Sequence, residues 1–85
     1  MKRPDWWDWE VELTPHIEKR MEDRDFTEVD LRAMMEKASA IRPDVVEGRW
    51  VIKARYRRKR WEIIVEPEEM ERLIVAITAY TVGGR

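Results

Sequence analysis

The stretch from Gly48 to Glu66 constrains this chain most, because two runs rich in β-branched and aromatic residues flank a short charged connection. This pattern predicts a β-hairpin with a polar tip at residues 57–60. Seven basic residues and no acidic residue lie between positions 49 and 60. Residues 1–48 hold eight basic and thirteen acidic side chains, and residues 61–85 hold two and five. The predicted hairpin is therefore the only one of these three segments with a net positive charge.

Length and composition narrow the class of protein. The 85 residues predict a single domain over 1–85, with loose ends at 1–5 and 83–85. The absence of cysteine excludes disulfides and thiolate metal sites, and we expect neither a metal nor a cofactor. No apolar run approaches the ~18 residues of a membrane span, so we expect a cytoplasmic protein without membrane contact. The net charge of −1 means that any attraction to phosphate must come from the hairpin.

The pattern outside the hairpin predicts two further strands and two helices. Residues 6–13 alternate as in a half-buried strand, with Trp6 turned outward, and residues 73–80 are apolar on both faces. Thr14-Pro15 begins a helix that runs to about Arg24. A capping box at 27–30 begins a second helix that runs to about Arg42. We predict an α+β fold of order β-α-α-β-β-β, with a mainly antiparallel four-stranded sheet and two helices packed on one face.

Two short helices can cover only one face of such a sheet. Strict alternation along each strand places an apolar group on the other face, rimmed by charged residues. An open apolar patch of this kind is typical of a binding surface. The candidate partner-binding residues are Val51, Ile64, Ile74 and Ala76.

The chain resembles the RelE/BrnT-like toxin superfamily, which has the barnase–EndoU–colicin–RelE-type ribonuclease fold, and is most similar to a small uncharacterised bacterial family within it. Four short motifs carry the resemblance: His16 with Arg20, Arg24-Asp25-Phe26-Thr27, Gly48-Arg49-Trp50, and Thr78-Ala79-Tyr80. The resemblance covers most of residues 14–82. It implies a toxin of a toxin–antitoxin system that acts on RNA without metal, and it implies the catalytic set His16, Lys53, Arg55, Thr78 and Tyr80.

Cleavage of RNA without metal requires a base, an acid and fixed cations around the phosphate. His16 has the only side chain whose unperturbed pKa lies near neutrality, and Glu62 is an alternative base. Lys53 and Arg55 belong to the open face, together with Thr78 and Tyr80. The candidate RNA-binding residues are Arg20, Arg49, Arg57, Arg58, Lys59 and Arg60.

Structural interpretations of the same residues remain open. His16 can be a surface residue at a helix start, and Lys53 and Arg55 can pair with carboxylates on neighbouring strands. The basic tip can be a solvated turn that discourages edge pairing. Two functions therefore stand side by side. One is a toxin-like protein that binds RNA, with cleavage undecided. The other is a non-catalytic interaction module that binds an antitoxin-like protein or a second copy as a homodimer.

Overall fold

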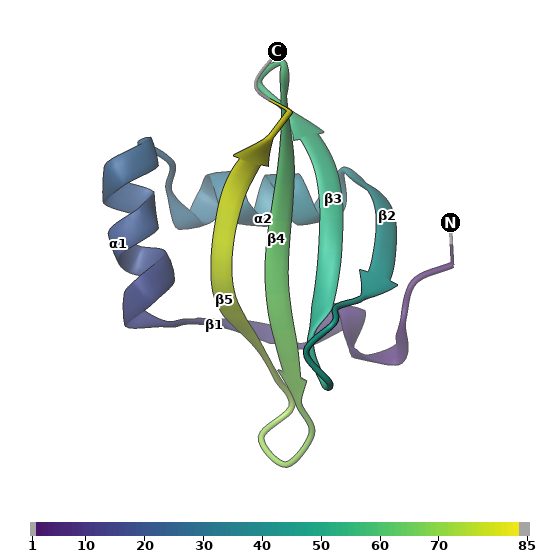
Figure 1. Cartoon of the computed structure of the whole chain (residues 1–85). Coiled ribbons are helices and arrows are strands. Elements are labelled where there is room, and N and C mark those ends of the chain that lie inside the picture. Colours follow the sequence, from purple (N-terminus) through teal and green to yellow (C-terminus); the bar gives the residue numbers. More distant parts are fainter. Residues whose placement is uncertain (1, 84–85) are drawn as a thin grey trace.

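The computed structural model describes residues 2–83, and Figure 1 labels its elements. In chain order they are η1 (Asp5–Asp8), β1 (Glu10–Leu13), α1 (Pro15–Arg24), α2 (Glu28–Glu36), β2 (Ala38–Pro43), β3 (Trp50–Tyr56), β4 (Lys59–Glu68) and β5 (Leu73–Val82). The five strands form one sheet in the order β1-β5-β4-β3-β2. Part of the predicted loose ends, namely residues 1 and 84–85, lies outside the described residues. Neither α-helix of the described chain is long and apolar enough to cross a bilayer.

The α+β class with two helices is confirmed, but the sheet has five strands rather than four. The second helix was expected to reach Arg42, yet it ends at Glu36 and residues 38–43 pair antiparallel with β3. Leu31, Met34, Met35 and Ala38 continue one helical stripe, so periodicity alone did not show this end. The strand is favoured because it satisfies the backbone groups along the edge of β3.

The first strand is shorter than its alternation predicted. Residues 5–8 form a 3₁₀ helix, and only residues 10–13 pair with β5, in parallel. Trp6 was expected to face outward, but it is only 9% exposed. Its ring centroid lies 5.9 Å from that of Trp50, so the 3₁₀ turn carries Trp6 into the core.

Both helix starts follow the predicted capping chemistry. The Thr14 hydroxyl accepts a hydrogen bond from the Ile17 backbone N–H at 3.2 Å and donates one to the Ala76 carbonyl at 2.9 Å. Thr27 and Asp30 form a complete capping box at the start of α2. The hydrogen bond from Thr14 to Ala76 also ties the start of α1 to β5. Figure 1 shows α1 beside β5 and α2 behind the sheet.

The helices cover one face of the sheet and enclose the core. Ile17 of α1 and Leu31 and Met34 of α2 have no exposed surface. They belong to one cluster with the inward residues of the sheet, which include Ile52, Ile63 and Val65. Burying apolar side chains of this size stabilises the fold by about 1.5–3 kcal/mol each. The opposite face carries no helix and is called the open face below.

The predicted hairpin is confirmed as β3 and β4, and its turn is tighter than the sequence suggested. Only Arg57 and Arg58 lie between the two strands. Both have positive φ, 53° and 66°, as in a type I′ turn. This backbone costs about 1 kcal/mol or more for each residue that is not glycine. The turn therefore keeps two arginines at a place where Asn-Gly would be easier to accommodate.

A bulge in β5 overturns the predicted assignment of faces. Ile64 pairs with Thr78, but the next residue, Val65, pairs with Ala76, so Ile77 is an extra residue. The bulge reverses the alternation on its N-terminal side. Ile74 and Ala76 were expected on the open face, and instead they are fully buried in the helix-covered core.

The predicted open apolar patch is therefore absent. Of its four residues, Val51 and Ile64 remain on the open face, where they pair with each other across β3 and β4. Their exposed fractions are only 2% and 7%. The four predicted residues therefore offer a partner almost no exposed apolar surface.

Candidate functional site

A basic pocket lies on the open face near the hairpin turn. Its volume is about 410 Å³, and three cations, Lys53, Arg55 and Arg60, contribute to its lining. Glu62 and Val82 lie beside them on the same face. Sheet register explains the convergence, because residues directly opposite one another on paired strands point to the same side. Lys53 faces Glu62, and Arg55 faces Arg60.

The pair formed by Arg55 and Arg60 is the unusual feature of this pocket. Like charges directly opposite each other on antiparallel strands destabilise a sheet. Both side chains are exposed, and within the described residues neither forms an ion pair with a carboxylate. An anion placed between the two guanidinium groups would relieve their repulsion and accept hydrogen bonds from both.

Glu62 and Tyr80 form a polar pair at the side of the pocket. The Tyr80 hydroxyl donates a 2.8 Å hydrogen bond to Glu62 Oε1 across β4 and β5. Burial of the phenol, followed by this hydrogen bond, raises the pKa of Tyr80 above its usual value. The phenol is therefore protonated at neutral pH, which is the state that a proton donor needs.

The structure brings together part of the predicted catalytic set. Lys53 and Arg55 line the basic pocket, and Tyr80 is joined to it through Glu62. Thr78 is one cross-strand row farther along β5, opposite Ile64, and does not line the pocket.

His16 does not join the set. It is exposed on α1, which lies beside β5, so β5 and β4 separate it from β3 and its two cations. Arg20 is half-buried on the same helix. The expectation that these two residues act with Lys53 and Arg55 has no support in the arrangement of the elements.

Some of the predicted RNA-binding residues form ion pairs within the protein, and others do not. Arg49 Nε donates to Glu66 Oε1 at 3.2 Å, and an Arg57 guanidinium nitrogen donates to Asp30 Oδ1 at 2.9 Å. The ion pairs expected as an alternative for Lys53 and Arg55 are not found among the described residues, and Arg49 and Arg57 form ion pairs instead. Arg58, Lys59 and Arg60 are exposed, and none forms an ion pair with another described residue. The available charge thus lies at the turn and the beginning of β4.

Asp30 is a buried carboxylate that the sequence did not single out as an anchor for the hairpin. It is 6% exposed and accepts hydrogen bonds from Thr27, Tyr56 and Arg57. The bond from Tyr56 and the backbone bond from Thr27 hold the pKa of Asp30 below its usual value. The aromatic and basic residues at the end of β3 were the available signal, but the pairing of residue 30 with residues 56 and 57 needs the fold.

The described residues contain no group of three or more histidine, cysteine or acidic side chains placed to hold a metal ion. Comparisons of the chain with family models, curated proteins and solved structures found no match. The candidate site therefore rests on its own geometry.

Proposed function

We propose that this protein binds RNA through the basic pocket and the adjoining hairpin turn. The main supporting observation is the Arg55–Arg60 pair, two exposed cations directly opposite each other on β3 and β4 with no carboxylate partner among the described residues. Exposed Arg58 and Lys59 continue the positive charge along the turn. A row of cations longer than one pocket suits a polymer of phosphates better than a single phosphate ion.

The choice of RNA comes from the resemblance to RelE/BrnT-like toxins, and cleavage is the finer part of the same proposal. His16 is not near the pocket, so Glu62 is the base that this arrangement favours. Tyr80 would protonate the leaving oxygen, and Lys53, Arg55 and Arg60 would stabilise the charged phosphorane. All five groups lie on the open face of β3, β4 and β5.

The experiment is incubation of the protein with tRNA and mRNA at low salt, with binding and strand cleavage read separately. Arg55→Ala with Arg60→Ala should weaken binding strongly. The matched control is Lys19→Ala with Lys37→Ala, which removes the same charge from α1 and from the C-cap of α2. If both double variants bind RNA like the unmodified protein, the pocket is not the site.

Cleavage has its own variants, which leave the cations in place. Glu62→Gln and Tyr80→Phe should abolish strand cleavage and leave RNA binding nearly unchanged. If the unmodified protein binds RNA but cleaves no strand, the proposed cleavage is wrong and the proposed RNA binding stands.

The alternative of an interaction module loses its supporting observation. Two of its four candidate residues, Ile74 and Ala76, belong to the helix-covered core, and Val51 and Ile64 are nearly buried on the open face. No described feature of this face favours an antitoxin-like protein or a homodimer over RNA.

A further inference from the structure

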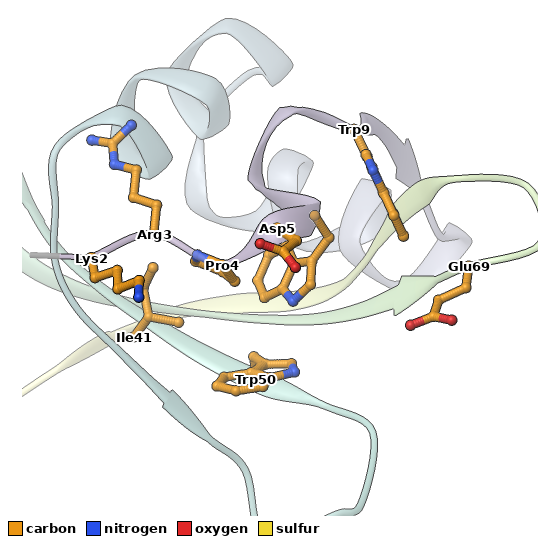
Figure 2. Close-up of a pocket in the computed structure, with 9 residues that line it drawn as sticks. Lys2, Arg3, Pro4, Asp5, Trp9, Ile41, Trp50 and Glu69 are labelled. Atoms are coloured by element: carbon orange, nitrogen blue, oxygen red, sulfur yellow. The ribbon is translucent and has the colours of Figure 1, made fainter.

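A second cavity lies at the opposite end of β3 from the hairpin turn, and no residue lines both sites. Its volume is about 510 Å³, and Figure 2 shows its lining. Three tryptophans, Trp6, Trp9 and Trp50, contribute to the wall, together with the carboxylates of Asp5 and Glu69. We call this cavity the tryptophan pocket.

The fold builds this wall from distant segments. Trp6 and Trp9 come from the 3₁₀ turn and the residue after it, whereas Trp50 begins β3. The rings of Trp6 and Trp50 have centroids 5.9 Å apart and planes inclined by 55°, so they form two walls of a corner rather than a stack. Trp9 and Trp50 are half-buried, which leaves part of each indole surface open to a ligand.

Two acids, Asp5 and Glu69, and two cations, Lys2 and Arg3, line the pocket. Asp5 and Glu69 are exposed, and neither forms an ion pair within the described residues. Arg3 is engaged elsewhere, since it donates to the Glu36 carbonyl at 3.1 Å and lies 5.0 Å from the centre of the Trp7 ring. Lys2 and Glu69 lie on opposite sides of the view in Figure 2.

We propose that the tryptophan pocket binds a methylated ammonium group. Indole faces attract cations, and a quaternary ammonium gains this attraction without losing strong hydration. The carboxylates at the rim add Coulombic attraction, and an apolar wall suits the methyl groups. A neutral apolar ligand would use the wall and leave both carboxylates without a partner.

The first experiment compares choline with its neutral isostere 3,3-dimethyl-1-butanol, using the indole N–H signals in a ¹⁵N–¹H NMR titration. Choline should shift the signals of Trp6, Trp9 and Trp50, and leave Trp61, which lies outside the pocket, unchanged. The neutral isostere should bind about tenfold more weakly or worse. Equal affinity of the two ligands, or no saturable shift with choline, would overturn the proposal.

Variants test the charge of the rim without altering the rings. Glu69→Gln should weaken choline binding several-fold, and Asp5→Asn should add to that loss. Glu71→Gln is the matched control, because Glu71 is an exposed acid of the same turn that does not line the pocket. Equal effects of the Glu69 and Glu71 variants would contradict a role for the rim carboxylate.

A free quaternary ammonium compound and a trimethylated lysine side chain carry the same chemical group. A second arm therefore titrates a peptide with one trimethyl-lysine against the same peptide with unmodified lysine. Tighter binding of the trimethylated peptide than of choline assigns the site to a protein partner, and the reverse assigns it to a small molecule. Both results support the pocket, whereas preference for unmodified lysine over the trimethylated form contradicts it.

Discussion

Tyr56 donates a 2.6 Å hydrogen bond to Asp30, and this contact joins the end of β3 to the first turn of α2. Asp30 also accepts from the Thr27 backbone N–H at 2.9 Å and from Arg57 at 2.9 Å. One carboxylate therefore completes the cap of α2 and fixes the first residue of the hairpin turn. This link holds Arg57 in place and leaves its neighbour Arg58 exposed.

Tyr56→Phe should lower the free energy of unfolding, because it removes the shortest bond to a buried carboxylate and offers no replacement. Tyr80→Phe is the matched control. Its bond to Glu62 is 2.8 Å long and involves a carboxylate that is not part of a helix cap. Urea unfolding of both variants should show the larger loss for Tyr56→Phe. Equal losses would mean that Asp30 is not a special anchor.

The pKa of Asp30 is lowered in the folded protein, foremost by the hydrogen bond from Tyr56. A carboxyl group with a depressed pKa stabilises the fold above its unfolded pKa of about 3.9, and this contribution is lost as the pH falls through the folded value. The unmodified protein should therefore exceed Asp30→Asn in stability at about pH 7, and the gap should narrow below about pH 4. Urea titrations across this range test the sign, and a gap that widens in acid contradicts it.

The bulge at Ile77 predicts different costs for adjacent substitutions in β5. Ile74 is fully buried, whereas Val75 is half-buried on the open face. Ile74→Ala should cost about 2–5 kcal/mol, the usual range for a large-to-small change in a core. Val75→Ala should cost clearly less. Chemical denaturation of the two variants measures both losses of stability. A larger loss for Val75→Ala than for Ile74→Ala would contradict the bulge and support strict alternation along β5.

Much of the fold follows from local signals in the sequence. The capping residues Thr14 and Thr27 set the starts of both helices, and the two runs around the basic turn set the hairpin. What could not be predicted depends on contacts between distant segments. The Ala38–Pro43 strand exists because the edge of β3 can pair with it, and Trp6 is buried because Trp50 lies opposite.

The candidate site shows the same division. Alternation places Lys53 and Arg55 on one face of β3, and the hairpin register then brings Arg60 opposite Arg55. By contrast, the position of His16 depends on how α1 packs beside β5, and the loss of Ile74 and Ala76 from the open face depends on the bulge. Neither arrangement leaves a local signature in the sequence.

The facing arginines predict a conflict between stability and binding. Arg60→Glu replaces a like-charge pair with an opposite-charge pair, so it should raise stability by about 0.2–1 kcal/mol and weaken RNA binding. Lys53→Glu makes the same change of charge opposite Glu62, and it should lower stability instead. Thermal unfolding at low salt measures the stability changes of the two variants. Destabilisation by Arg60→Glu would show that Arg55 and Arg60 do not repel each other in the free protein.

The salt dependence of RNA binding tests the central claim most directly. For single strands, the slope of log K against log salt is about −0.7 for each phosphate contacted. Removal of Arg55 and Arg60 together should therefore flatten the slope by about 1.4 between about 50 mM and 200 mM salt, whereas Lys19→Ala with Lys37→Ala should leave it unchanged. A slope that is the same for the unmodified protein and both double variants would contradict a phosphate site between the two arginines.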